Sequence, residues 1–191
     1  MSRGTPLINK YKILLIVPII LLLDQWSKAW VVQSLVKRDS IPIIPNFFDI
    51  VHVTNKGAAF GIFRGMPESI RHPFFCILSL VAILLIILYY TRLKEKHLLP
   101  YVCLSLILGG AIGNLWDRFA RGEVVDFLSI HWYDKMIHWQ FGSFRLHFLL
   151  EWPAFNVADS AITLAVVGFA LFTFRKEAST GSDSCDRSSS R

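Results

Sequence analysis

The sequence has few cysteines and no motif that would hold a metal ion. Of its three cysteines, Cys76 and Cys103 lie within apolar blocks and Cys185 lies in a polar tail. They give neither a disulfide framework nor the paired spacing of a zinc site. The six histidines include no HExxH pair or comparable arrangement. The sequence therefore predicts a protein without a metal ion or any other cofactor.

Charged residues are also scarce, at 18% of the chain, and their formal net charge is +6. No basic stripe interleaved with aromatic residues stands outside the hydrophobic blocks. Such a stripe is the usual footprint of nucleic-acid binding, so we predict no nucleic-acid partner. The positive charge is instead expected to set the orientation of the chain in a membrane.

Apolar residues dominate what is present. They make up 53% of the chain, with a mean hydropathy of +0.47, and they are concentrated in blocks of membrane-spanning length. No small-residue cleavage pattern follows Leu23, so the first block is predicted to remain as a helix. We predict an all-α membrane protein with four transmembrane helices, at about residues 13–36, 73–90, 98–116 and 155–174.

Two long segments between the helices, residues 37–72 and 117–154, leave this apolar pattern. In the first, residues 47–53 are rich in aromatic and β-branched side chains, which predicts a short strand or a strand pair. Residues 66–72 are predicted to form a short helix at the membrane interface. Residues 1–174 are predicted to form one domain, followed by a disordered, Ser-rich tail at 175–191.

Lys and Arg are about twice as dense in the two termini and the loop at 91–97 as in the two long segments. These residues concentrate on the cytoplasmic side of membrane proteins. We therefore predict that both termini are cytoplasmic and that both long segments lie on the opposite side.

Asp24 and Lys28 are ionisable residues inside the first apolar block. Their i,i+4 spacing allows an ion pair along one helix. At about 1.5 Å per residue, Asp24 lies past the middle of a hydrocarbon core about 30 Å thick. A charge at that depth usually faces the bundle or a cavity. The pair is predicted to steady the bundle, to belong to a functional site, or both.

Polar side chains gather where apolar blocks meet the second long segment. Asn114 and Arg118 are four residues apart and precede Asp126, while Asn156 and Asp159 are three apart at the start of the fourth block. Two carboxylates brought together and partly shielded from water tend to share one proton and titrate as a unit. Such a pair can activate a water with its ionised member and protonate a leaving group with its neutral one.

Spacing alone leaves two classes of function open. The two acids suit a protease that uses an activated water, but intramembrane acids also form the proton relays of transporters. Covalent catalysis is the weaker hypothesis, because Ser160 has no evident base and neither Cys76 nor Cys103 has a histidine in its own block.

Four stretches together resemble the bacterial lipoprotein signal peptidases, the signal peptidase II family. They are DQWSK (24–28), VTNKGAAFGIF (53–63), GGAIGNLWDRFARGEVVDF (109–127) and WPAFNVADSAIT (152–163), in family order. The resemblance implies a monomeric aspartic endopeptidase of the bacterial inner membrane, inhibited by the antibiotic globomycin. Such an enzyme cuts a prolipoprotein just before its diacylglyceryl-modified cysteine.

The resemblance also implies roles for individual residues. Asp126 and Asp159 match the family's catalytic pair. The positions that match its substrate pocket are Asp24, Lys28, Asn55, Gly57, Asn114, Arg118, Asn156 and Ala161. The first long segment is expected to form a small β-cradle over the site, on the periplasmic face, with residues 66–72 as a short helix beside it.

The sequence departs from the family pattern between residues 127 and 152. This stretch is about a dozen residues longer than expected there. It carries several aromatic residues, which are Trp132, Trp139, Phe141, Phe144 and Phe148. We expect them to form an additional aromatic patch at the lipid interface, and we expect removal of residues 134–145 to alter substrate preference or antibiotic sensitivity more than expression.

Overall fold

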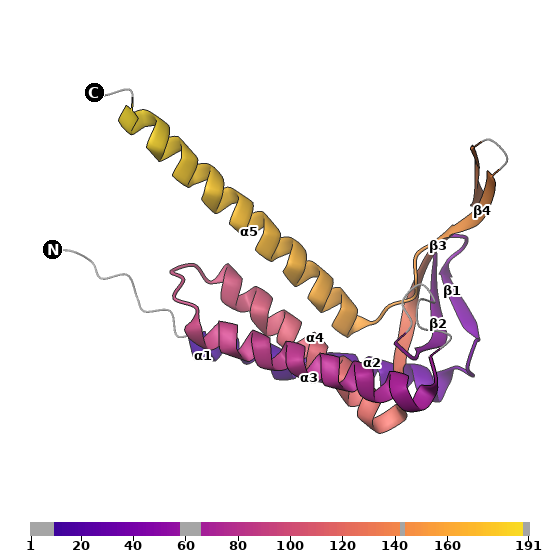
Figure 1. Ribbon diagram of the computed structural model, residues 1–191. Helices are drawn as coiled ribbons and strands as arrows, with labels where there is room; N and C mark the ends of the chain where they lie inside the picture. Colours follow the sequence, from indigo (N-terminus) through magenta and orange to yellow (C-terminus); the bar gives the residue numbers. More distant parts are fainter. Residues whose placement is uncertain (1–9, 58–65, 142–143, 189–191) are drawn as a thin grey trace.

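The computed structural model describes residues 10–57, 66–141 and 144–188, and it describes their side chains outside 133–151 and 177–188. The helices are α1 (Lys10–Ile13), α2 (Ile16–Ser34), α3 (Glu68–Arg92), α4 (Leu99–Arg121) and α5 (Val157–Ser188). The strands are β1 (Ser40–Ile44), β2 (Phe48–Asn55), β3 (Val124–Phe141) and β4 (Phe144–Glu151). Figure 1 shows the strands gathered at one end of the helices.

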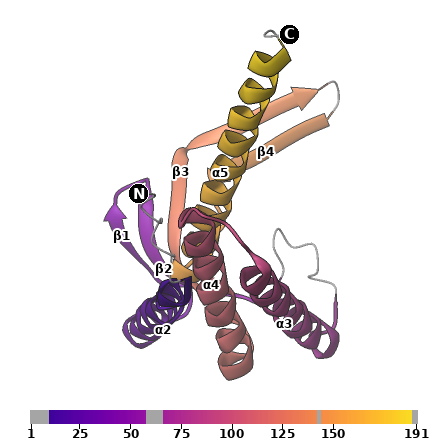
Figure 2. The same cartoon turned by 90° about the vertical axis from the view of Figure 1, so that its left-hand side faces the viewer.

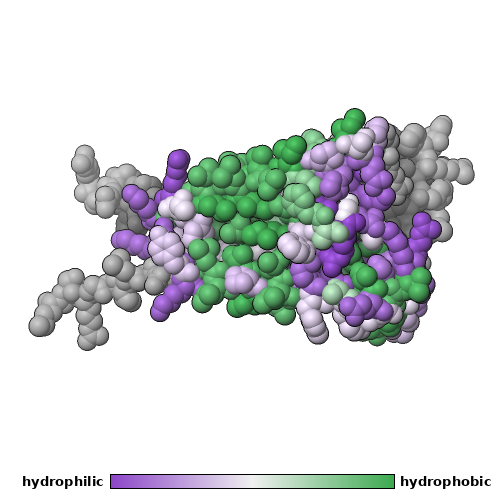
Figure 3. Space-filling view, turned by 90° about the horizontal axis from the view of Figure 1, so that it is seen from below, coloured by the Kyte–Doolittle hydropathy of each residue, from purple (hydrophilic) through white to green (hydrophobic). Residues whose placement is uncertain are grey.

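Four helical segments are long and apolar enough to cross a membrane, which confirms the predicted number of spans. They are Lys10–Ser34, Glu68–Arg92, Leu99–Arg121 and Val157–Lys176. On the face shown in Figure 3, hydrophobic residues cover the middle of the molecule, and hydrophilic residues gather toward both ends. This is the surface expected of helices that contact lipid tails along their middle.

The central helix is α4. In the most apolar 18-residue stretch of α4, 56% is buried inside the protein, against 11% to 17% of the corresponding stretch in the other three spans. Its glycines permit this close packing: a Cβ added at Gly110 would lie 2.5 Å from the carbonyl oxygen of Ala158 on α5. One added at Gly113 would lie 2.6 Å from Oδ2 of Asp24 on α2. Small residues at these two positions therefore allow α4 to approach α2 and α5 closely.

Prolines set the ends of two helices. Pro18 has no N–H to donate to the carbonyl of Leu14. That carbonyl instead accepts from the N–H of Val17 at 3.0 Å. The regular α-helix is interrupted at this point, between α1 and α2. Pro67 precedes the first residue of α3, whereas Pro73 lies inside this helix. At this sixth position of α3, Pro73 leaves one carbonyl of the first turn without its intrahelical donor, and the helix continues through it.

Two predicted helix boundaries differ from the structure, because Pro73 does not end a helix and because no proline stops α5. Residues 68–72 are the first turns of α3 rather than a separate short helix. At the other end of the chain, α5 continues to Ser188 through residues predicted as a disordered tail. Adding residues to an existing helix is far cheaper than starting one, and no proline interrupts this stretch. The apolar span itself ends at Lys176.

A four-stranded antiparallel sheet in the order β1-β2-β3-β4 makes the all-α class incomplete. β2 confirms the strand predicted at residues 47–53, whereas its partner β1 lies before that range and was not predicted. β3 and β4 come from residues predicted only as a long loop. The register of β2 with β3 pairs Val53 with Asp126 and Asn55 with Val124, so the first long segment lies beside the acid of the second.

Two local features place the acids at this end of the bundle. Gly122 ends α4 in the left-handed conformation at φ +76°, and its N–H donates to the carbonyl of Arg118 at 3.0 Å. This turn directs the chain into β3. Asn156 caps α5, because its Oδ1 accepts from the N–H of Asp159 at 2.9 Å.

Candidate active site

Asp126 and Asp159 line the same cavity, as the sequence predicts. The cavity has a volume of about 1020 Å³ and lies between the sheet and the start of α5. Pairing of Leu128 with Phe155 draws the start of α5 against β3, with the N–H of Phe155 donating to the carbonyl of Leu128 at 2.9 Å. Two acids 33 positions apart, at 126 and 159, therefore meet across one apolar space.

Two asparagines connect the acids. Nδ2 of Asn156 donates to Oδ1 of Asp126 at 2.8 Å, and Nδ2 of Asn114 donates to Oδ1 of Asp159 at 2.7 Å. Nδ2 of Asn156 is also 3.3 Å from Oδ1 of Asn114. Each carboxylate thus accepts from a fixed amide group, and the two asparagine side chains also contact each other. These contacts restrict the orientations of both acids.

Asp126 is the more buried acid, with 3% of its surface exposed. Burial raises the pKa of Asp126 from its ordinary 3.8 to about 7, and the nearby negative charge of Asp159 adds to this rise. Hydrogen bonds from Asn55 and Asn156 act in the opposite direction. The raised pKa means that Asp126 holds a proton below neutral pH.

Replacing Asp126 by Asn is expected to stabilise the fold, and more so at high pH. Between about pH 4 and 7 the carboxyl is ionised in the unfolded chain but protonated in the folded one, so wild-type stability falls as the pH rises. Asn never ionises, so Asp126→Asn should gain nothing near pH 4 and about 2–4 kcal/mol above pH 7. Thermal unfolding in detergent at both pH values measures this difference.

The exposed Asp39 provides the matched control, and Asp39→Asn should change the unfolding midpoint little at either pH. An Asp126→Asn variant that is equally destabilised at both pH values would contradict the ionisation cost assigned to this burial.

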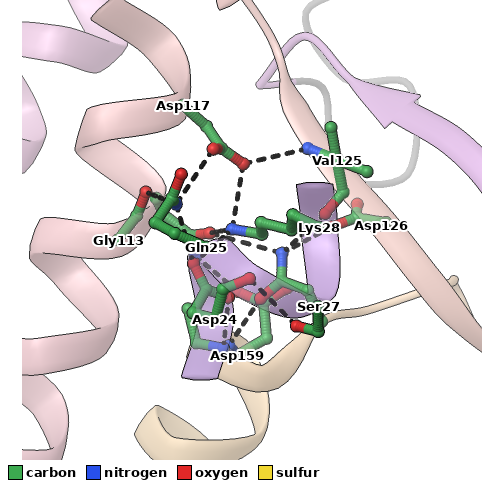
Figure 4. A network of polar contacts seen from close by, with 12 residues as sticks. Asp24, Gln25, Ser27, Lys28, Gly113, Asp117, Val125, Asp126 and Asp159 are labelled. Carbon is green, nitrogen blue, oxygen red and sulfur yellow. Dashed lines mark hydrogen bonds and ion pairs between the residues drawn. The ribbon is translucent and has the colours of Figure 1, made fainter. Parts of the chain in front are cut away.

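A cluster of fully buried charges lies behind the cavity and is drawn in Figure 4. Nζ of Lys28 is 2.8 Å from Oδ2 of Asp24 and 2.9 Å from Oδ2 of Asp117, and all three side chains are 0% exposed. The same Nζ donates to Oδ1 of Asn114 at 3.0 Å. The predicted intrahelical pair of Asp24 and Lys28 is therefore confirmed, and it also contacts the asparagine that holds Asp159.

Sequence reasoning left Asp117 out of the site, although it connects three elements. Its Oδ2 accepts from the N–H of Val125 on β3 at 3.2 Å, one residue before Asp126. Its Oδ1 accepts from Nε2 of Gln25 on α2 at 3.1 Å and pairs with Arg121 on α4. An acid three residues after Asn114 was the only available signal, and two of its partners, Gln25 and Lys28, are remote in sequence.

The remaining predicted residues take different places. Asn55 lines the cavity and accepts from the N–H of Gly57 at 2.8 Å, which stabilises a turn where Gly57 has φ +90°. A Cβ at Gly57 would meet the ring of Phe75 at 2.3 Å. The guanidinium of Arg118 lies 5.9 Å from the centroid of this same ring.

Ala161 is buried beneath the cavity on α5, at 5% exposure. Of the ten predicted residues, Asp126, Asp159 and Asn55 contribute to the cavity wall. The pocket-lining residues that sequence reasoning did not single out include Lys56, Arg71, Ile130, Trp152, Thr163 and Leu164.

The alternative nucleophiles lack an activating base within the described residues. The hydroxyl of Ser160 donates to the carbonyl of Asn156 at 2.9 Å. Cys76 has no histidine in its own apolar block, but His72, one residue before that block, places Nε2 3.8 Å from the Sγ of Cys76. However, this Nε2 is 2.8 Å from the carbonyl of Arg118, where it must donate, and Cys76 does not line the cavity.

The arrangement suits acid–base chemistry on a substrate that enters an apolar space. It offers one buried acid that keeps its proton near neutral pH, a second carboxylate in the same cavity, and amide groups that fix both. Among the side chains that the structure describes, which exclude those of 133–151 and 177–188, no group of three His, Cys, Asp or Glu residues is placed to hold a metal ion.

Comparison with known proteins identifies the family of this chain. Residues 16–175 match the family described as signal peptidase (SPase) II. A lipoprotein signal peptidase of Syntrophotalea carbinolica is 44% identical over 81% of this chain and 85% of its own, and one of Desulforapulum autotrophicum is 41% identical over 83% and 88%. A solved structure described as a bacterial membrane enzyme superimposes with a TM-score of 0.70 at 27% identity, over 88% of this chain and 91% of that one.

Proposed function

The chain belongs to the signal peptidase II family, and from that premise we propose that Asp126 and Asp159 are its catalytic pair. It is a membrane aspartic peptidase that removes the signal peptides of lipoproteins. The bond cut is proposed to be the one just before a diacylglyceryl-modified cysteine. The observation that carries the assignment is that both carboxylates line one cavity while Asp126 has a pKa near 7.

The proposed reaction uses one protonated and one ionised acid. Asp159 removes a proton from a water molecule as the water oxygen attacks the carbonyl carbon, and Asp126 protonates the carbonyl oxygen. When the C–N bond breaks, the proton on Asp159 passes to the leaving amine. A hydroxyl proton of the tetrahedral intermediate returns to Asp126, so the pair is restored.

Asn114 and Asn156 are proposed to position these acids. Their amide donors, at 2.7 and 2.8 Å from Asp159 and Asp126, favour fixed carboxylate orientations. Asp24, Lys28, Asn55, Gly57, Arg118 and Ala161 are proposed to shape the substrate pocket, Asn55 at its wall and the others from behind it. Full activity of Asn114→Ala and Asn156→Ala at normal expression would refute the positioning role.

The membrane is proposed to supply much of the substrate positioning. Four apolar spans bring the cavity to one end of the bundle, where a diacylglyceryl group can stay in the bilayer while the peptide reaches the acids. The sheet is proposed to act as a cradle on the periplasmic side, with the first turns of α3 at the interface. The basic residues Arg92, Lys94 and Lys96 at the opposite end support cytoplasmic termini.

We also propose that residues 1–174 form one peptidase domain that works as a monomer on lipid-modified prolipoprotein.

Cleavage of a synthetic prolipoprotein peptide by the purified protein tests the function. A peptide with diacylglyceryl cysteine should be cut before that cysteine, and the same peptide with a free thiol should be cut far more slowly. Equal cleavage of both peptides, or cleavage elsewhere, would contradict the proposed specificity.

A further inference from the structure

The hairpin of β3 and β4 has an outer part that the proposed chemistry does not use. We call residues 136–141 and 144–149 the outer arm. The register passes from Trp132 opposite Leu150 to Met136 opposite Leu149, so β3 contains three residues here, 133–135, that have no counterpart in β4. Such a bulge bends a hairpin and re-aims the part beyond it. The outer arm is thus a separate extension of the sheet.

The register sorts the residues of the outer arm by polarity. Directly opposed residues of an antiparallel pair share one face of the ladder, and alternate pairs share the same face. One set of pairs is Ile137 with Phe148, Trp139 with Leu146, and Phe141 with Phe144. The other set is Met136 with Leu149, His138 with His147, and Gln140 with Arg145. The first face consists entirely of apolar residues and the second is largely polar.

The outer arm begins among exposed aromatic side chains. Trp132 and Trp152 line the cavity and remain 38% and 65% exposed at the base of the hairpin. The N–H of Trp152 donates to the carbonyl of Ile130 at 2.9 Å, which fixes the two strands at this point. Trp116 and Phe119, near the end of α4 on the same side of the bundle, are also exposed. Exposed aromatics at the ends of membrane spans mark the interface.

The direction of the outer arm fits a membrane surface. Figure 1 shows β3 and β4 running crosswise to α2, α3 and α4 at the end of the bundle. In Figure 2, where these helices are seen close to end-on, the hairpin extends sideways past α5. Because the helices cross the membrane, an element crosswise to them lies along its surface rather than through it.

We propose that the outer arm is a lipid-binding element whose apolar face rests in the boundary between headgroups and acyl chains. No charged residue occupies the six positions of this face, and four of the six are aromatic, the residue class that interfaces favour. Two exposed aromatic residues, Trp132 and Trp152, also stand at the base of the arm.

This binding would hold the wall of the cavity at the level of the lipid headgroups. Trp132 and Trp152 belong both to the base of the hairpin and to the cavity lining. A substrate whose acyl chains stay in the membrane would then meet the cavity without leaving the interface. This consequence rests on the proposed function, whereas lipid contact by the outer arm does not.

Spin labels on the two faces test the lipid contact. Single cysteines are introduced at Leu146 and Phe148 on the apolar face and, as controls, at Gln140 and His147 on the polar face. Only Cys185→Ser is needed as background, because Cys76 and Cys103 are buried. The full chain is reconstituted in phosphatidylethanolamine–phosphatidylglycerol vesicles, and collision rates with oxygen and with a water-soluble nickel chelate are measured.

Labels at Leu146→Cys and Phe148→Cys are expected to collide more with oxygen, and labels at Gln140→Cys and His147→Cys more with nickel. Equal access of nickel to both faces would overturn the proposal. So would spin–spin broadening that rises with the protein-to-lipid ratio and disappears on dilution with unlabelled protein, because it would show contact with a second copy.

An activity measurement separates this proposal from the proposed function. The variant Trp139→Ser/Phe148→Ser should raise KM severalfold for lipid-modified peptide in vesicles and leave kcat unchanged, while in detergent both values stay near wild type. Gln140→Ser/His147→Ser is the control and should match wild type in both media. Wild type could show no cleavage while the spin labels on the apolar face still collide more with oxygen and those on the polar face more with nickel. In that case the proposed function fails and the lipid contact stands. An unchanged KM in vesicles would contradict the role in substrate capture.

Discussion

Asp159→Asn is expected to lower kcat by about 10²- to 10⁴-fold while the protein remains folded, because this is the usual contribution of a general acid–base group. The amide can still accept the hydrogen bond that Nδ2 of Asn114 donates at 2.7 Å, so the local structure has no reason to collapse. What is lost is the carboxylate that takes a proton from water. Cleavage of the lipid-modified peptide, measured alongside elution as a single folded species, gives the result.

Ser160→Ala is the matched control, since Ser160 is the next residue on α5 and lines the same cavity. Its hydroxyl only donates to the carbonyl of Asn156, so kcat should stay within a few-fold of wild type. If Ser160→Ala were inactive and Asp159→Asn active, the reaction would use a covalent serine intermediate instead of an activated water.

Lys28→Met is expected to prevent stable folding. It leaves Asp24 and Asp117, both 0% exposed, without the ammonium group that lies 2.8 and 2.9 Å from their carboxylates. Removing one partner of a buried ion pair typically costs about 3–5 kcal/mol, because the remaining charge stays buried. A comparable loss here is a large part of the stability of a domain. Thermal unfolding and the yield of folded protein in detergent measure it.

Lys37→Met is the control for the lost charge. Nζ of Lys37 pairs with Glu123 at 2.6 Å, but its side chain is 51% exposed, and exposed pairs contribute about 0–1 kcal/mol. A Lys28→Met protein as stable as Lys37→Met would show that the buried carboxylates take up protons and do not need the lysine. The cluster would then have no role in holding α2 against α4.

The spans and the acids of the site could be predicted because their signals are local. Long apolar blocks identify the helices regardless of packing. Asn156 and Asp159 are three residues apart, a spacing that predicts a helix N-terminus, and the cap forms as Asn156 accepts from the N–H of Asp159. Gly122 likewise ends α4 where the helical pattern breaks. Each of these outcomes depends on neighbours within one helical turn.

The parts that were not predicted depend on pairing between distant residues. The buried role of Asp117 follows from Lys28, Gln25 and Val125, two of which belong to α2. β3 and β4 need each other to form a ladder, and composition alone suggested a loop. The alternation of Ile137, His138 and Trp139 is a strand pattern, so sequence did carry one signal for this hairpin. Residues 58–65, which complete the family-like stretch after Gly57, lie outside the described residues.

The central claim is that the acids hold one proton between them and that Asp126 carries it. The pH dependence of kcat/KM for wild type tests this directly, since it reports the essential groups of the free enzyme. With the pKa of Asp126 at about 7, kcat/KM should fall as the pH rises through about 7, while far-ultraviolet circular dichroism confirms that the fold is unchanged. A kcat/KM that stays constant or rises up to about pH 9 would contradict a protonated Asp126 as the catalytic acid.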